Sequence, residues 1–186
     1  MAAKELPSPE VLRQLLDYNP DTGRFVWKRR GIEWFTVGRF SAEWSMEKWN
    51  TRYAGQEAFA SVDNLGYRQG TVQYVKLRAH RVAWAMHFGV WPTGVIDHIN
   101  GDETDNRICN LRQASTSENG MNRGAQINST SGVKGVCFDK NRGKWMASIC
   151  RGSKRTNLGR FETMEAAQAA YNRAAAALHG DFARAV

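Results

Sequence analysis

The residues best suited to chemistry lie in the polar segment 95–119 of this 186-residue chain. Asp97 and His98 are adjacent there, and Asn119 follows further along. Imidazole titrates near neutral pH, so His98 is suited to accept a proton from water. A carboxylate and a carboxamide offer the oxygen ligands that Mg²⁺ prefers. Together these groups suit hydrolysis of a phosphodiester, in which water is activated and charge on the leaving oxygen is stabilised.

Three predicted elements must bring these side chains together. Residues 94–96 form a short apolar strand that ends just before the Asp-His pair. Residues 100–102, Asn-Gly-Asp, predict a turn of the kind that joins antiparallel strands, because Asn-Gly readily takes a positive φ. Ser115 or Thr116 can cap a following helix, which carries Asn119. We expect the order strand, long loop, helix, with room for a metal ion between strand and helix.

An ordinary polar turn is the alternative interpretation of this segment. Asp97 would then bond to its own backbone, and His98 would be exposed. The wider spacing, through Asn110 and Asn119, favours a functional site instead. The other loop carboxylates are expected to be solvated charges: Asp102, Glu103 and Asp105.

Several short motifs in this region point to one family. They are Asp97-His98-Ile99-Asn100-Gly101-Asp102, Asn106, Asn110-Leu111-Arg112 and Glu118-Asn119. Over roughly residues 65–122 the chain resembles the HNH endonucleases of phages and introns. The resemblance implies a ββα-metal (His-Me finger) fold, with His98 as general base and Asp97 and Asn119 as metal ligands. It makes Asn110 the residue that ties the loop together.

The cofactor expected from these ligands is one Mg²⁺ or Mn²⁺ ion per site. Two-metal sites need ligands that bridge or surround both ions, and only Asp97 is adjacent to the base. One carboxylate and one carboxamide hold a cation weakly until phosphate oxygens complete its shell. We therefore expect weak metal binding without DNA.

His80 allows two interpretations. It begins the segment 80–88, whose apolar residues predict a helix that ends at Gly89. From this earlier element the side chain could approach the site as an accessory residue. A buried, hydrogen-bonded core histidine explains it equally well.

Composition limits the class of protein further. Hydrophobic residues make up 42% of the chain, which suits one ordinary domain or two small ones. No apolar run approaches the length of about twenty residues that a membrane span needs. Three cysteines without CxxC spacing favour a reducing cytoplasm over a disulfide framework. We expect a cytoplasmic monomer rather than an oligomer, in a bacterial host cell if a phage encodes it.

Positive charge is concentrated in the C-terminal third. The formal net charge is +8, and residues 120–186 carry eleven Lys and Arg against four Asp and Glu. This excess attracts a polyanion, and no strongly apolar helical face accompanies it to favour a membrane. We therefore expect double-stranded DNA as the partner.

The composition also predicts how the chain is divided. After Gly120 large apolar residues become scarce, and Gly, Asn, Ser and Gln dominate as in a linker. The predicted segments are an N-terminal accessory part (1–54), the nuclease core (55–122), the linker (123–132) and a C-terminal module (133–186).

Before the polar segment, the chain predicts elements that support it. Ser8-Pro9 predicts a helix start, and 24–28 a strand after a turn. Further strands are expected at 58–60 and 67–75. The tryptophans within 31–54 are better explained by packing than by base stacking.

The C-terminal module predicts a small sheet and one helix. Strand-like stretches lie at about 133–138, 144–151 and 155–160, and an alanine-rich helix runs over about 163–179. We expect a three-stranded antiparallel sheet packed on one α-helix, so the whole chain has an α+β fold.

Motifs in this module resemble a second family. They are Ser131-Gly132-Val133-Lys134-Gly135-Val136, Lys144-Trp145-Met146-Ala147 and Leu158-Gly159-Arg160-Phe161-Glu162-Thr163. Over roughly residues 130–185 the chain resembles the apetala-two/ethylene-response-factor DNA-binding domain, whose exposed sheet face enters the major groove. The expected DNA contacts are Lys134, Lys140, Arg142, Lys144, Arg151, Lys154, Arg155 and Asn157. Cys137, Cys150 and Asn157 replace arginines and a tryptophan of the plant pattern, so base preference does not transfer.

The hypothesis that follows is a metal-dependent, site-directed DNA endonuclease of the phage homing type, which nicks one strand or cuts both. His98 acts as general base, and the products carry 5′-phosphate and 3′-hydroxyl ends. Two alternatives remain open. One is a catalytically silent, sequence-specific DNA-binding or regulatory protein on the same scaffold, and the other is a protein that acts on RNA.

Overall fold

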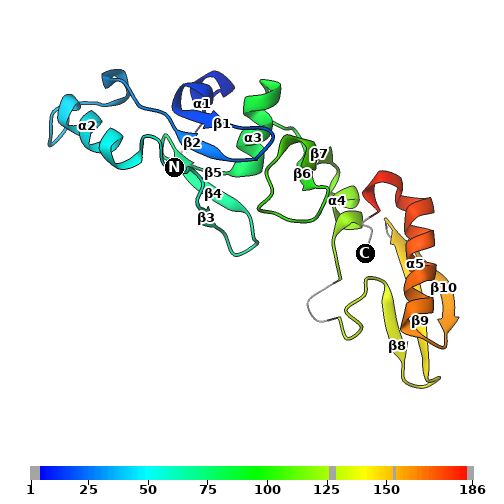
Figure 1. Cartoon of the computed structure of the whole chain (residues 1–186). Helices are drawn as coiled ribbons and strands as arrows, with labels where there is room; N and C mark the ends of the chain where they lie inside the picture. The colour runs from blue at the N-terminus through cyan, green and yellow to red at the C-terminus, as the bar shows by residue number, and fades with distance from the viewer. Residues whose placement is uncertain (1–4, 126–128, 153, 184–186) are drawn as a thin grey trace. The chain divides into compact units, whose positions relative to one another are not determined.

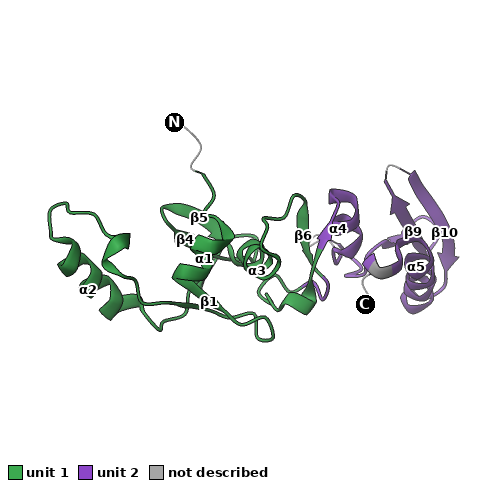
Figure 2. Cartoon of the chain, turned by 90° about the horizontal axis from the view of Figure 1, so that it is seen from above, with its two compact units in different colours: residues 1–98, 102–112 green, residues 99–101, 113–186 purple. Residues whose placement is uncertain are grey.

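The computed structural model describes residues 5–125, 129–152 and 154–183. The chain forms two compact units, Met1–His98 with Asp102–Arg112 and Ile99–Gly101 with Gln113–Val186 (Figure 2). Part of the predicted linker, 126–128, lies outside the described residues. Within the described ranges, no helix combines the length and apolar character that crossing a membrane requires.

Short strands and helices alternate in the first unit (Figure 1). In chain order they are α1 (Pro9–Leu15), β1 (Leu16–Tyr18), β2 (Phe25–Trp27), η1 (Ile32–Trp34), α2 (Ala42–Tyr53), β3 (Ser61–Val62), β4 (Arg68–Val72), β5 (Val75–Arg78), α3 (Ala79–Phe88), β6 (Val95–His98) and η2 (Ile108–Asn110). Strand β1 pairs with β2, and β3, β4 and β5 form an antiparallel sheet.

A single apolar cluster anchors the strand that carries the Asp-His pair. It contains Leu12 and Leu15 of α1 and Val82 of α3, all without exposed surface. Ile96 of β6 belongs to the same cluster. Fully burying a side chain of this kind contributes roughly 1.5–3 kcal/mol, so β6 is held firmly at its apolar residue.

The predicted ends of the two supporting helices are confirmed. Ser8 caps α1, because its hydroxyl accepts a hydrogen bond from the Val11 backbone N at 3.3 Å. Helix α3 ends at Gly89, which adopts a φ of 75° in the left-handed region.

The strand predicted at 67–75 is a hairpin instead. Strands β4 and β5 pair with Val72 opposite Val75, and Gln73 and Tyr74 form the turn with φ values of 47° and 63°. Two consecutive positive φ values match the twist of a two-residue hairpin. The pattern concealed this turn because neither residue is Gly, Asn or Asp.

Two further strand predictions need correction. The strand expected at 58–60 is wrong, because Ala58 and Phe59 pack into the core and β3 begins only at Ser61. Strand β1 was not expected, since it follows α1 without any turn residue between them.

After β6 the chain returns through a long loop. Gly101 takes a φ of 69°, which confirms the turn predicted at 100–102. The partner of β6 is β7 (Leu111–Ala114), a strand that begins after the loop and η2. The residue pattern predicted only strand, long loop and helix here, whereas the ββα arrangement implied by the family resemblance includes this second strand.

The second unit contains the predicted three-stranded sheet and helix. Its elements are α4 (Thr116–Asn122), β8 (Val136–Asp139), β9 (Lys144–Arg151), β10 (Lys154–Phe161), α5 (Met164–His179) and η3 (Gly180–Phe182). The sheet is antiparallel in the order β10–β9–β8, and α5 lies along it (Figure 1). The mixed α+β class predicted for the chain is confirmed.

A separate core holds sheet and helix together. Ala147 and Ile149 of β9 are buried with Ala167, Tyr171 and Ala175 of α5. Small alanines let the helix approach the sheet closely, because little side chain stands between the two backbones.

Candidate functional site

A buried ion pair holds the side chain of Asp97. The residue is 3% exposed at the end of β6. Both Nε and Nη2 of Arg112, on β7, lie 2.8 Å from its Oδ2. Two charge-assisted contacts on one oxygen fix the direction of the carboxylate. Outer partners of this kind orient a metal-ligating carboxylate.

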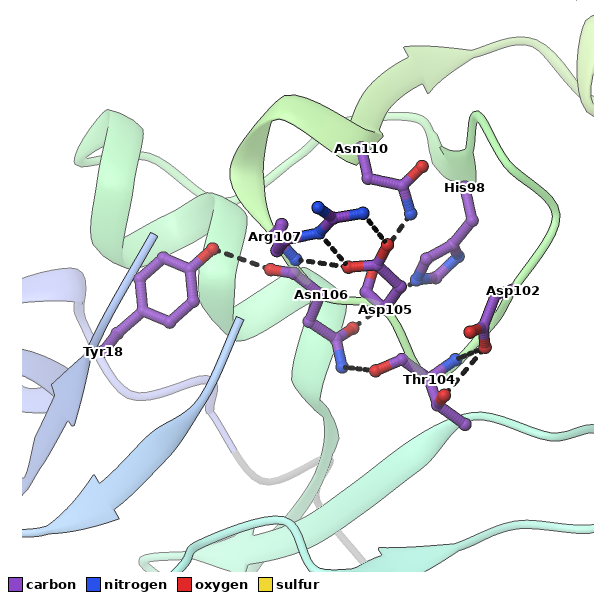
Figure 3. Close-up of polar contacts among 8 residues, drawn as sticks. All are labelled: Tyr18, His98, Asp102, Thr104, Asp105, Asn106, Arg107 and Asn110. Carbon is purple, nitrogen blue, oxygen red and sulfur yellow. Dashed lines mark hydrogen bonds and ion pairs between the residues drawn. The ribbon is translucent and has the colours of Figure 1, made fainter. Parts of the chain in front are cut away.

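The neighbouring imidazole is also buried and is oriented by an amide. His98 is 4% exposed, and its Nε2 lies 3.4 Å from Oδ1 of the fully buried Asn106 (Figure 3). The Asn106 Nδ2 donates to the Thr104 carbonyl at 3.0 Å, which turns Oδ1 toward His98. Because that oxygen can only accept, Nε2 is the donor of this hydrogen bond in the tautomer that carries the proton there.

Burial favours the neutral form of the His98 imidazole over the protonated form. Desolvation lowers the pKa of His98, and the hydrogen bond to Asn106 Oδ1 and the charge of Glu103 oppose this in part. A base must be unprotonated to accept a proton. The environment therefore leaves His98 neutral at neutral pH, as a general base requires.

His80 lies against His98. The two ring centroids are 5.1 Å apart with planes at 82°, and Tyr67 packs on the His80 ring at 4.9 Å. His80 is 4% exposed, and its buried Nδ1 has no hydrogen-bond partner among the described residues. Burial lowers the pKa of His80 to about 3. The residue thus approaches the base from α3, and its accessory role stays a prediction.

The loop after β6 is tied by its own polar side chains (Figure 3). Asn110 Nδ2 donates to the Asp105 carbonyl at 2.9 Å. The Asp105 carboxylate accepts from Arg107 Nε at 2.8 Å, and Asp102 Oδ1 accepts from the Thr104 hydroxyl at 2.7 Å. Asp102 is exposed, as expected of a solvated charge, whereas Asp105 is partly buried, and both also form hydrogen bonds within the loop.

The N-terminal hairpin supports the same loop. The Tyr18 hydroxyl donates to the Asn106 carbonyl at 2.8 Å (Figure 3). The Ile108 amide donates to the Pro20 carbonyl at 3.0 Å. Gly23 has a φ of 71°, and a Cβ there would meet the Asn106 backbone carbon at 2.6 Å. Only glycine permits this approach. Asn106 is therefore held from two sides, a role its place in the motif did not reveal.

Asn119 and Asp97 are the residues whose side-chain oxygens were predicted to bind a cation. Asn119 lies on α4, whose first turn is fixed by a capping box between Ser115 and Glu118. Among the described residues, no three His, Cys, Asp or Glu side chains form a metal-binding group. A carboxylate with a carboxamide has the chemistry of a weak Mg²⁺ site that waters and phosphate complete. The convergence of Asn119 with Asp97 stays a prediction.

The sheet of the second unit presents one polar face. Cross-strand neighbours share a side, and β10–β9 pairing sets Arg155 opposite Cys150 and Asn157 opposite Ser148. Ser148 accepts from the Arg155 guanidinium at 2.9 Å. Arg160, opposite Met146, belongs to this face and was not among the predicted contacts.

The predicted DNA-contacting cations have different local partners. Lys144 pairs with Glu162 at 2.7 Å, and Arg142 lies 3.4 Å from Asp139. Lys134 instead donates to backbone carbonyls at the end of α4. Lys140, Arg151 and Lys154 are exposed at strand ends and turns.

A buried Asp-His pair at a strand end, together with a basic sheet on a helix, defines a nuclease-type DNA-binding protein. Comparison with known proteins agrees. The HNH endonuclease family matches residues 77–121, and the AP2 domain family matches residues 131–181. Protein 3.8 of Escherichia phage T7 is 34% identical over 119 residues, 63% of this chain and 98% of that protein. No solved structure matches.

The chain belongs to the HNH endonuclease family and carries an AP2 domain after its HNH region. Both domain types bind DNA, and HNH nucleases generally use divalent metal ions.

Proposed function

We propose that this protein is a metal-dependent, site-directed DNA endonuclease with a ββα-metal active site. The observation that carries the proposal is the buried pair at the end of β6. Arg112 orients the Asp97 carboxylate, and Asn106 orients the imidazole of His98. Burying two polar groups this deeply costs stability, and a purely structural turn would leave them in water.

In the proposed reaction, the unprotonated ring nitrogen of His98 accepts a proton from a water molecule as the water oxygen attacks phosphorus. The bond from phosphorus to the 3′ oxygen breaks, which leaves 5′-phosphate and 3′-hydroxyl ends. Asp97 and Asn119 would hold the divalent ion, Mg²⁺ or Mn²⁺, and the bound ion supplies charge stabilisation for the leaving oxygen. Asn110 keeps the loop closed beneath His98 through its bond to Asp105.

In this proposal the AP2 module (133–186) selects duplex sites, and the core (55–122) cuts them. The relationship to a protein of phage T7 supports a phage enzyme, and we extend the proposal to the homing type. A monomer with one catalytic centre is expected to nick one strand per encounter.

The test is relaxation of supercoiled plasmid in the presence of Mg²⁺ or Mn²⁺. We expect the wild-type protein to produce nicked circles, and His98→Ala to lower the rate by roughly 10²- to 10⁴-fold. His87→Ala is the matched control, since His87 is an exposed histidine of α3. Full activity of His98→Ala, or activity that persists under chelation, would refute the proposed mechanism.

A catalytically silent DNA-binding regulator is the second candidate. The contact of Arg112 with Asp97 favours it, because a guanidinium can satisfy the carboxylate without a metal. Wild-type protein that binds DNA tightly and never nicks it with either metal would establish this alternative. The same assay on single-stranded RNA addresses cleavage of RNA.

A further inference from the structure

The segment between β2 and β3, within the first unit, starts and ends beside Trp27 of β2. The Trp27 amide donates to the Gln56 carbonyl at 3.0 Å, and the Gly55 amide donates to the Trp27 carbonyl at 2.8 Å. Residues 28–54 are therefore an excursion from one point of the fold. Figures 1 and 2 both show α2, within this excursion, standing apart from α1 and α3 of its unit.

An amide side chain and an aromatic contact hold this segment, since Asn50 bonds to Arg30 and Trp49 packs on Trp27 with ring centroids 5.7 Å apart. Asn50 is buried, its Oδ1 accepts from the Arg30 amide at 2.8 Å, and its Nδ2 donates to the Arg30 carbonyl at 2.9 Å. Ser41 caps the helix by accepting from the Trp44 amide. Helix α2 thus has a fixed position and serves as a platform for side chains, although none of its described residues belongs to the core cluster of the first unit.

One side of the platform combines aromatic rings with cations. Trp44, Lys48 and Arg52 recur at four-residue spacing, which places them along one face of α2. Phe40 stacks on Trp44 with ring centroids 4.1 Å apart, and both remain exposed, at 48% and 43%. Tyr53 is exposed nearby in the sequence, beside Arg52.

Lys48 and Arg52, the cations of this face, lie on rings rather than on carboxylates. Lys48 Nζ is 4.4 Å from the Trp44 ring centroid, and the Arg52 guanidinium carbon is 5.3 Å from that of Tyr53. Outside this face, the Arg30 guanidinium carbon is 3.8 Å from the Trp49 ring centroid. Among the described residues, neither Lys48 nor Arg52 forms an ion pair, and buried Arg30 Nε has no hydrogen-bond partner. Residues 28–54 carry six Lys and Arg against three Asp and Glu.

A ligand that matches the Trp44, Lys48 and Arg52 face of α2 must carry both negative charge and flat rings. Single-stranded DNA does so, because its phosphates attract cations and its unpaired bases stack on aromatic side chains. In a duplex the base faces are hidden within the helix, so exposed Phe40 and Trp44 would gain nothing from it. The mixture of exposed rings and unpaired cations therefore favours an unpaired strand.

We propose that α2 and its flanking residues form a binding site for an unpaired DNA strand. Bases stack on the Phe40–Trp44 pair, and phosphates contact Lys48 and Arg52. The proposal goes beyond cleavage by adding a second DNA contact, and it rests on the proposed function only in taking DNA as the nucleic acid.

The test measures binding of fluorescently labelled oligo(dT) and of a non-specific DNA duplex to the full chain, with chelator present so that nothing is cut. We expect Phe40→Ala with Trp44→Ala to weaken oligo(dT) binding at least about fivefold and leave duplex binding unchanged. Lys48→Met should make the oligo(dT) salt slope shallower by about 0.7. Phe88→Ala is the matched control, because Phe88 is an exposed ring that packs at a tilt against Trp84 of α3.

Unchanged oligo(dT) affinity in the double variant would overturn the proposal, and so would an equal loss for oligo(dT) and duplex. Tighter binding to oligo(U) than to oligo(dT) would overturn the assignment to DNA. Trp44→Phe, which keeps a ring, should bind as the wild type does, and thermal unfolding checks that each variant is folded. Because the assay contains no active metal, its outcome is independent of whether the protein cuts plasmid.

Discussion

The imidazole rings of His80 and His98 lie edge to face in the first unit, 5.1 Å apart. Burial lowers the pKa of both, and that of His80 falls to about 3. The charges of His98, Arg78 and Arg81 lower it further, whereas Asp63 acts in the opposite direction. His80 therefore stays neutral beside the base, and a proton on it would repel the proton that His98 takes from water.

This burial has a consequence for stability. In the unfolded chain His80 returns to its usual pKa near 6.5, so between pH 6.5 and about 3 only the unfolded state takes up its proton. Stability is complete above that window and decreases as pH falls through it, by roughly 2 kcal/mol at pH 5.

Urea unfolding at pH 7 and pH 5 tests this expectation. The wild-type protein should lose stability on acidification, and His80→Gln should lose markedly less, because glutamine takes up no proton. An equal loss in both proteins would show that His80 is not held neutral in the folded state. Only the difference between the two pH values is compared, so any general cost of the substitution cancels.

Helix α4 shows how a short element depends on its neighbours. It is seven residues long, and its N-terminal end is satisfied by the capping box. Its last carbonyls are satisfied by Lys134, whose Nζ lies 3.0 Å from Gly120 O, 2.7 Å from Met121 O and 2.7 Å from Arg123 O. A cation at a helix C-terminus also complements the helix dipole. Lys134 was predicted to contact phosphate, and its observed partners favour a structural task.

Replacing Lys134 distinguishes the two tasks. We expect Lys134→Met to loosen α4, which carries the proposed ligand Asn119, and to lower the nicking rate at saturating DNA roughly tenfold. Its salt dependence of DNA binding should stay as in the wild type. Lys140→Met, at an exposed turn, is the control that should make the slope shallower by about 0.9. If Lys134→Met made the slope of log DNA affinity against log salt shallower, Lys134 would be a phosphate contact after all.

At the scale of the whole molecule, charge decides affinity for DNA. The net charge of +8 is concentrated after residue 119, and the AP2 region carries most of it. Local partners moderate this charge, because Lys144 pairs with Glu162 and Asp139 lies beside Arg142 and Arg160. Exposed pairs of this kind are weak, so phosphates can compete for the cations.

Neutralising about five phosphates predicts that log affinity falls with log salt at a slope near −4.5. Binding to duplex DNA measured between about 50 and 200 mM salt tests the slope. Lys144→Ala combined with Arg155→Ala should make it shallower by about 1.8, whereas Lys28→Ala, in the first unit, is the control. A slope near zero for the wild type would contradict the electrostatic account.

Much of the fold follows from information carried within a few neighbouring residues. Ser8 and Ser115 cap their helices, Gly89 ends one, and alternation places Ala147 and Ile149 toward a helix. Each of these effects depends on backbone geometry over about one helical turn or one strand, so the residues alone predict it. The adjacent Asp-His pair at a strand end was predictable for the same reason.

Only the tertiary structure decided which residues orient the side chains of Asp97 and His98. Asp97 meets Arg112 across two strands, His98 meets Asn106 within a folded loop, and Tyr18 reaches that loop from far away in the sequence. Such contacts depend on how distant segments pack, and packing is a property of the whole core rather than of any local pattern. The contacts between cations and aromatic rings at α2 were likewise decided by tertiary structure. The spacing of residues along the chain does not reveal which side chains contact each other in the folded protein.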